Sequence, residues 1–149
     1  MASLLTLTVQ QPSRNLAAGE VLIAEGDPGG DLYVLESGKL VVSRAGVPLA
    51  TISAEGALIG EMSVLLGTES TATVTAEKPT TIRVVRDALA FLERQPLVAL
   101  RVAMLLSQRL DATSALLVEM QKDGKAKSAA EQGIFGRLMT ALVSEGKGG

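Results

Sequence analysis

The chain of 149 residues has the length of one domain with at most a small appendage, and its 47% hydrophobic residues are enough to bury a core. Its 14 Lys and Arg residues against 16 Asp and Glu residues give a formal charge of −2, which predicts no strong field for nucleic acid or an anionic membrane. The chain contains no histidine and no cysteine, which excludes Ser-His and Cys-His nucleophile pairs, histidine general bases, histidine-ligated metals and disulfides.

The N-terminal residues 1–9 lack the basic region and the sustained apolar run of a signal peptide. No stretch approaches the roughly 20 consecutive apolar residues of a membrane span. The absence of cysteine fits a reducing compartment. We therefore expect a soluble, cytoplasmic protein that has no membrane partner.

Short apolar segments follow one another between Gly19 and Arg86, and Gly, Pro, Asp and Ser separate them at close intervals. Many short strands at even spacing are typical of a β-barrel or jelly roll. Leu, Val, Ile and Ala must supply the core, because aromatic residues make up only 2% of the chain. The expected strands cover residues 20–24, 31–35, 39–43, 47–52, 71–76 and 80–85.

Residues 58–76 form a distinct stretch among these strands. It opens on Gly60 and Glu61, continues as one apolar turn, breaks at Gly67 and then alternates Thr with apolar residues. A turn that begins at Gly60 exposes backbone N–H groups, and a helix N-terminus favours an anionic group by roughly 0.3–1 kcal/mol. Glu61 is placed to accept a hydrogen bond from a sugar hydroxyl, although it would also complement the helix dipole without any ligand. The pattern predicts a ligand cradle.

After Arg86 the hydrophobic period becomes helical. Asp87 is expected to cap a helix over residues 88–94, and Pro96 to begin a longer helix that ends near Lys122. Positions spaced 4-3-4-3-4-3 along the long helix form an a/d seam of three heptads, more than packing on one barrel requires. We expect residues 97–106 to pack on the barrel and the second half to form a homodimer; the alternative is that the whole stripe packs on the chain's own barrel. The seam consists of Ala99, Ala103 and the dimer-interface candidates Leu106, Leu110, Thr113, Leu117 and Met120.

The remaining residues, 123–149, predict a polar hinge over 123–128 and a short amphipathic helix over 129–144. Five basic against three acidic residues from Lys122 onward do not make a nucleic-acid footprint. One amphipathic segment also cannot hold the three helices of a helix-turn-helix module. We therefore expect no DNA-binding domain.

Two motifs resemble the cyclic nucleotide-binding domain family. Gly26 and Asp27 followed by residues 32–40 are similar to its Gly-Asp, Leu-Tyr-x-Ile and Ser-Gly-x-Val elements. Gly60, Glu61 and Met62, with Ala72 and Thr73, match its phosphate-binding cassette, Gly-Glu-(Leu/Met)-Ala-Leu and then Pro-Arg-(Ser/Ala)-Ala-Thr. The resemblance covers residues 16–86 and implies a barrel of jelly-roll type, cAMP or cGMP as ligand, no cofactor, no enzymatic activity, and a long helix that often forms the dimer interface. The ligand-binding residues that it implies are Gly60, Glu61, Met62, Ser63, Ser70, Thr71 and Ala72.

The cassette departs from the family pattern at its most important position, where Ser70 replaces the Arg that holds the cyclic phosphate and Glu69 replaces the Pro. A hydrogen bond to a charged group contributes roughly 1.5–3 kcal/mol, and a bidentate Arg–phosphate pair lies at the upper end. At about 1.4 kcal/mol per tenfold change, its loss predicts affinity weakened about ten- to several-hundred-fold. Arg44, Arg83, Arg101 or an arginine of a second subunit are the candidates for a replacement cation.

The sequence thus predicts a mainly β fold with flanking helices, with a cyclic-nucleotide-binding-like domain over 1–122 and a hinge with a short helix over 123–149. Three hypotheses for function remain open. The chain is a ligand-sensing regulatory module that binds cyclic nucleotides weakly or binds another small molecule. Alternatively, it is a degenerate module that serves as a dimerisation or protein-interaction scaffold. The third, minor hypothesis is a cupin-like barrel enzyme, which the absence of histidine ligands disfavours.

Overall fold

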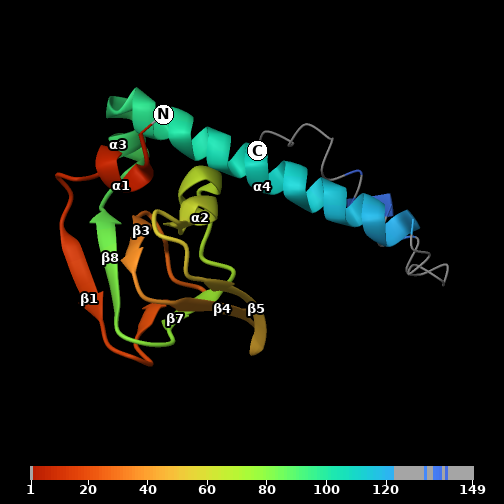
Figure 1. Ribbon diagram of the computed structural model, residues 1–149, viewed down its shortest axis with the longest axis horizontal. Coiled ribbons are helices and arrows are strands. Elements are labelled where there is room, and N and C mark those ends of the chain that lie inside the picture. The colour runs from red at the N-terminus through yellow and green to blue at the C-terminus, as the bar shows by residue number, and fades with distance from the viewer. Residues whose placement is uncertain (1, 123–132, 134–135, 139, 141–149) are drawn as a thin grey trace. The chain divides into compact units, whose positions relative to one another are not determined.

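The computed structural model describes residues 2–122, 133, 136–138 and 140 (Figure 1). The chain divides into two compact units, Met1–Val102 and Ala103–Gly149. The predicted hinge and most of the predicted final helix lie outside the described residues. The elements are α1 (Leu4–Leu7), β1 (Ser13–Leu16), β2 (Val21–Ile23), β3 (Leu32–Ser37), β4 (Leu40–Arg44), β5 (Val47–Ile52), β6 (Leu58–Ile59), α2 (Glu61–Leu66), β7 (Thr73–Ala76), β8 (Thr80–Val85), α3 (Ala88–Arg94) and α4 (Pro96–Lys122).

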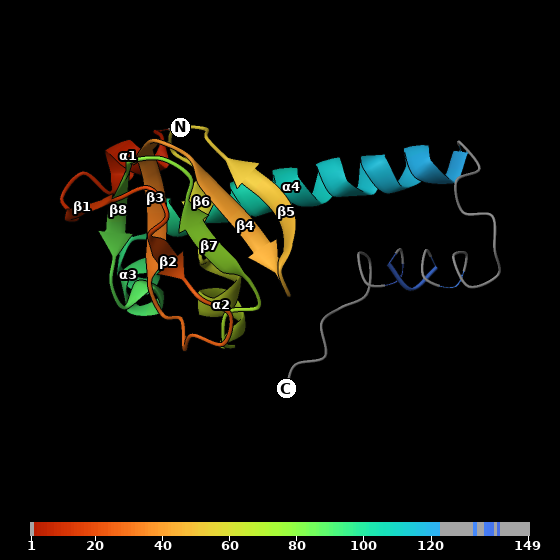
Figure 2. The same cartoon turned by 90° about the horizontal axis from the view of Figure 1, so that it is seen from below.

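The eight strands of the first unit form two four-stranded sheets, ordered β1-β8-β3-β6 and β2-β7-β4-β5. Every strand pair is antiparallel. Figure 2 separates the sheets, with β7, β4 and β5 together in one and β1, β8 and β3 in the other. Two four-stranded sheets that exchange strands in this order are the jelly-roll arrangement. The predicted mainly β barrel followed by a long helix is confirmed.

The core lies between the sheets, and both contribute aliphatic side chains to it. Leu35 of β3 and Ile82 of β8 come from one sheet and Leu40 of β4 from the other, and all three are fully buried. Alternation places these residues inward, as in β8, where Thr80, Ile82 and Val84 are buried and the residues between them are half-buried. The buried cluster comprises Leu16, Leu22, Leu35, Leu40, Ile59, Val74, Ala76, Ile82 and Val84.

The turn glycines that the sequence predicts have positive φ angles, and Gly38 shows why one of them must be glycine. A Cβ atom at Gly38 (φ 106°) would lie 2.6 Å from Thr80 Cα. The Oγ1 atom of the buried Thr80 accepts the Lys39 N–H at 3.1 Å and donates to Lys78 O at 2.7 Å. The turn after β3 is thereby fixed against the start of β8.

The two helices that follow the barrel have the expected bounds, but the expected cap of α3 does not form. α3 and α4 cover the expected residues, but Asp87 makes no side-chain hydrogen bond at the start of α3, and its φ of 47° is left-handed. The expected side-chain cap is therefore wrong. The Asp87 N–H instead donates to Asp31 Oδ1 at 3.1 Å, and the Ala88 N–H donates to Gly30 O at 2.8 Å. The β2–β3 loop thus holds the start of α3.

Within the first unit, α4 buries Val98 and Val102, which precede the seam positions Ala99 and Ala103 by one residue each. The half-buried Ala99 therefore does not lie at the centre of the buried face.

No helix in the part of the chain that the structure describes is long and apolar enough to cross a membrane.

In the second unit, the seam residues of α4 differ in exposure. Leu110 and Met120 are 47% and 45% exposed. Thr113 is also exposed, while Leu106 and Leu117 are half-buried. Much of the predicted seam is therefore accessible in this chain.

Candidate ligand cavity

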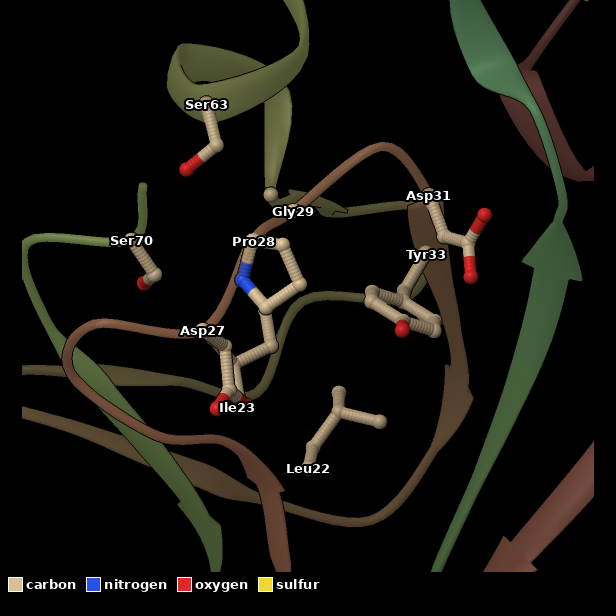
Figure 3. Close-up of a pocket in the computed structure, with 10 residues that line it drawn as sticks. Leu22, Ile23, Asp27, Pro28, Gly29, Asp31, Tyr33, Ser63 and Ser70 are labelled. Atoms are coloured by element: carbon tan, nitrogen blue, oxygen red, sulfur yellow. The ribbon is translucent and has the colours of Figure 1, made fainter. Parts of the chain in front are cut away.

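A cavity of about 170 Å³ lies inside the first unit, beside α2. β2, the β2–β3 loop and β3 form one part of its wall, and α2 and the segment before β7 form the other (Figure 3). Its lining combines an apolar floor with hydroxyl and carboxylate groups. The lining residues are Leu22, Ile23, Asp27, Pro28, Gly29, Asp31, Tyr33, Gly60, Ser63 and Ser70.

Gly60 fixes where α2 begins. Its φ is 87°, and a Cβ atom built there would lie 2.9 Å from the backbone oxygen of Asp31. A side chain at this position would be strained and would also collide with the loop, so only glycine lets β6 pass directly into the helix. α2 then runs for six residues and ends at Gly67, which is also left-handed. A helix this short contributes little dipole, so the expected help of its N-terminus to an anion is small.

The β2–β3 loop joins the two sides of the cavity through backbone contacts. The Gly26 N–H donates to Ser70 O and the Ser70 N–H donates to Asp27 O, both at 2.8 Å. At Gly29 (φ 70°), a Cβ atom would approach Ser63 Cβ to 2.8 Å, so the loop backbone lies directly on α2. The wall of the cavity is thus one connected surface of loop, helix and the strand that follows.

Ser70 occupies the position at which the resemblance implies a phosphate-binding arginine. Its hydroxyl donates to Ala72 O at 2.8 Å, a bond within its own turn. Among the described residues that line the cavity there is no Lys or Arg, whereas Asp27 and Asp31 both carry carboxylates. The cavity wall therefore has a formal charge of −2.

The three arginines considered as replacements do not line this cavity. Arg83 is engaged elsewhere, because its Nε donates to Glu36 Oε1 at 2.6 Å and its NH1 group donates to Thr8 O at 3.0 Å. Arg44 is exposed at the end of β4, and Arg101 lies on α4 with a buried Nε atom that has no hydrogen-bond partner. Within this chain, none of them takes the place of the missing cation.

The structure gathers three of the seven sequence-predicted ligand residues at the cavity, namely Gly60, Ser63 and Ser70. Glu61 is 8% exposed and is not among the lining residues. Met62 is 60% exposed, Thr71 is exposed and Ala72 is half-buried, and these three do not line the cavity either.

Sequence reasoning did not assign the lining residues of the β2–β3 loop and β3 to the site. Asp27 and Tyr33 belong to the Gly-Asp and Leu-Tyr elements of the resemblance, which were interpreted only as barrel turns and strands. Burial raises the pKa of Tyr33 above its ordinary value of 10.0, and the Asp31 carboxylate raises that pKa further. The phenol therefore remains a neutral hydrogen-bond donor at physiological pH.

The sequence model of the cyclic nucleotide-binding domain matches residues 13–93, which is more than half of the chain and includes the whole cavity. The chain belongs to the cyclic nucleotide-binding domain family. Its eight-stranded jelly roll with the short α2 helix is thus the barrel of this family.

Among solved structures, the catabolite activator protein of Thermus thermophilus is 32% identical, with a TM-score of 0.65 over 78% of this chain and 57% of that one. The N-terminal domain of a transcriptional regulator from Streptomyces coelicolor A3(2) is 31% identical, with a TM-score of 0.57 over 72% of this chain and 81% of that one. Both structures share their fold with this chain over most of its length.

Among curated proteins, a cGMP-dependent protein kinase of Drosophila melanogaster is 41% identical over 68 residues, which are 46% of this chain and 6% of the kinase. The CRP-like cAMP-activated global transcriptional regulator of Mycobacterium tuberculosis is 26% identical over 125 residues, which are 80% of this chain and 56% of the regulator. The chain thus spans a small part of the kinase and about half of the regulator.

Proposed function

We propose that this chain is a non-enzymatic, ligand-sensing regulatory module that works in the cytoplasm, and that the cavity beside α2 is its ligand site. We further propose that it binds cAMP and cGMP weakly, because Ser70 stands where the family has an arginine. The observation that carries this proposal is a cavity lined by Gly60, Ser63 and Ser70, to which the described part of the chain contributes no Lys or Arg.

Electrostatics support weak binding of a cyclic phosphate. An Arg–phosphate pair would supply roughly 1.5–3 kcal/mol or more. Ser70 offers little in exchange, because its hydroxyl proton is already donated to Ala72 O. Asp27 and Asp31 add like charge to the wall, which further disfavours an anion. The predicted loss of ten- to several-hundred-fold in affinity is therefore a lower bound.

The relatives support a role in which the barrel receives a small molecule and passes a signal on. The Drosophila relative is named as a cGMP-dependent kinase and the mycobacterial relative as a cAMP-activated regulator. In this chain, α4 is one helix of 27 residues that begins in the first unit and continues into the second. We propose that residues 1–122 act together, with the barrel as receptor and α4 as transmitter, and that they do so without a DNA-binding domain of their own.

Calorimetric titration with cAMP and cGMP tests the site directly. The wild type should show weak or no heat, and Ser70→Arg should gain at least tenfold in affinity, because the guanidinium restores the missing cation. Ser53→Arg is the matched control, since Ser53 is exposed in the turn before β6 and does not line the cavity. Equal affinity of the Ser70→Arg and wild-type proteins for both nucleotides would contradict the proposed site.

A second candidate function, a dimerisation scaffold, is favoured by the exposure of Leu110 and Met120 on the α4 seam. Exposed leucines at heptad spacing are suited to a helix–helix interface. Gel filtration of a Leu110→Glu/Leu117→Glu variant should show later elution than the wild type, whereas Gln108→Glu/Ala115→Glu on the opposite face should elute like the wild type. An unchanged elution volume of the seam variant removes the dimer from the proposal.

A further inference from the structure

We propose that the cavity binds an uncharged, hydroxyl-rich ligand more tightly than an anionic one. A phosphate-binding site would have the opposite preference. This inference rests on the proposed function, because it concerns the same cavity. Three properties of the cavity support it: the hydrogen-bonding groups on the wall that are free to bind a ligand, the charge of the wall and the volume of the cavity.

The polar side chains on the wall include acceptors as well as the hydroxyls of Ser63 and Tyr33, which can also donate. Asp27 Oδ2 accepts the Ala24 N–H at 2.9 Å, and the carboxylate has further lone pairs but no proton to give. The Ser70 hydroxyl donates its proton to Ala72 O at 2.8 Å and accepts the Ala72 N–H at 3.4 Å, so that one lone pair remains for a ligand. A phosphate diester is also an acceptor, whereas a sugar hydroxyl is a donor. A sugar hydroxyl can therefore donate to the Asp27 carboxylate, whereas a phosphate cannot donate to it.

The carboxylates of Asp27 and Asp31 have no cationic partner among the described residues that line the cavity. Asp31 has a cation nearby, since its Oδ2 lies 3.7 Å from Arg86 NH1, but the Arg86 side chain is 76% exposed and solvent screens it. Figure 3 shows the Asp31 carboxylate directed away from Ser63 and Ser70. Asp27 lines the cavity, and its backbone oxygen accepts the Ser70 N–H, so we take it as the carboxylate to test.

The space has the size of a single ring. A cavity of about 150 Å³ accommodates one benzene molecule, and this cavity has about 170 Å³. Leu22, Ile23, Pro28 and the ring of Tyr33 form apolar walls on which the faces of a ring can pack. The Tyr33 hydroxyl, kept neutral by burial, adds one donor for a ring hydroxyl or ring oxygen. A hydroxylated five- or six-membered ring satisfies all of these groups together.

Adenosine and cAMP are suitable probes, because they share base and sugar and differ in the cyclic phosphate. Calorimetric titration of the full chain should give an affinity for adenosine at least tenfold higher than that for cAMP. Raising the salt concentration from about 50 mM to 500 mM should reduce the ratio of the two affinities, because salt screens the repulsion between the wall carboxylates and the phosphate of cAMP. Asp27→Asn, which keeps the acceptor oxygen for Ala24 and removes the charge, should reduce it as well, and Ser70→Arg should reverse it.

Each other outcome is decisive. If the wild type binds cAMP as tightly as adenosine or more tightly, this inference is overturned, while a weak nucleotide sensor remains in place. If the wild type binds neither compound but Ser70→Arg binds cAMP, the cavity is a disarmed phosphate site and this inference is again overturned. If neither protein binds either compound, the proposed ligand site fails together with the inference. Circular dichroism of each variant shows that a loss of binding is not a loss of fold.

Discussion

Gly60 and Gly67 stand at the two ends of α2, and replacing each by alanine measures how tightly the cavity loop packs on this helix. Gly60 and Gly67 both have left-handed φ angles, 87° and 66°. A Cβ atom at Gly60 would meet Asp31 O at 2.9 Å, whereas a Cβ atom at Gly67 would have nothing within 4 Å. Gly67→Ala therefore carries the backbone penalty alone, about 1–2 kcal/mol. Gly60→Ala carries the same penalty and in addition an overpacking cost of about 1–3 kcal/mol, because its neighbour is backbone and not a flexible side chain.

Urea denaturation followed by tyrosine fluorescence measures this difference. Tyr33 is the one tyrosine of a chain without tryptophan, and it lines the cavity, so its emission reports on the first unit. Gly60→Ala should be less stable than Gly67→Ala by about 1–3 kcal/mol, which corresponds to a difference of at least about 4 °C in Tm. Equal stability of the two variants, within about 0.5 kcal/mol, would refute the close approach of the loop to α2.

Three further predictions concern a carboxylate, the cavity phenol and the core. The hydrogen bond from Ser13 lowers the pKa of Glu36 below 4.5, and the hydrogen bond and charge of Arg83 lower it further. The contribution of Glu36 to stability is therefore complete above pH 4.5 and is lost as the pH falls through the lowered pKa. Glu36→Gln should cost about 1–3 kcal/mol at pH 7, and the difference in Tm from the wild type should shrink below pH 4; a constant difference across this range would contradict the assignment. Spectrophotometric titration of Tyr33 should give a midpoint above 10.0 in the folded protein and the ordinary value in urea, whereas a folded midpoint at or below 10 would show that the ring is solvated. Leu40→Ala should destabilise by about 2–5 kcal/mol, while Leu49→Ala, at a side chain 59% exposed on β5, should change stability by less than about 0.5 kcal/mol; similar losses for the two would place the core elsewhere.

The barrel was predictable from the sequence because its local signals agree with one another. Two strands, Val47–Ile52 and Thr80–Val85, have the expected bounds, and α4 begins at the expected proline. Three elements were not predicted, namely α1, β1 and β6. β1 has the polar sequence Ser-Arg-Asn-Leu, of which only Leu16 is buried, so it lacks an apolar alternation. It is a strand because β8 pairs with it along its length, which is a tertiary effect.

The site was predictable only in part, for a similar reason. Gly60, Ser63 and Ser70 lie in one contiguous motif, and the resemblance of that motif to the phosphate-binding cassette grouped them. The other wall of the cavity is formed by residues of β2, the β2–β3 loop and β3, all of which precede Gly60 by 27 positions or more, and the antiparallel arrangement of the sheets brings them to α2. The cap expected of Asp87 failed because the β2–β3 loop offers Asp31 as a partner for its N–H, a contact that local propensity does not encode.

The central claim is that the cavity beside α2 is where a ligand binds. Amide chemical shifts, recorded while cAMP is added to the Ser70→Arg protein, test it most directly. The signals of Gly29, Gly60, Ser63 and residue 70 should shift first and furthest, while those of β5 should stay in place. Shifts confined to β5 or to α4, with the amides around the cavity unmoved, would contradict it.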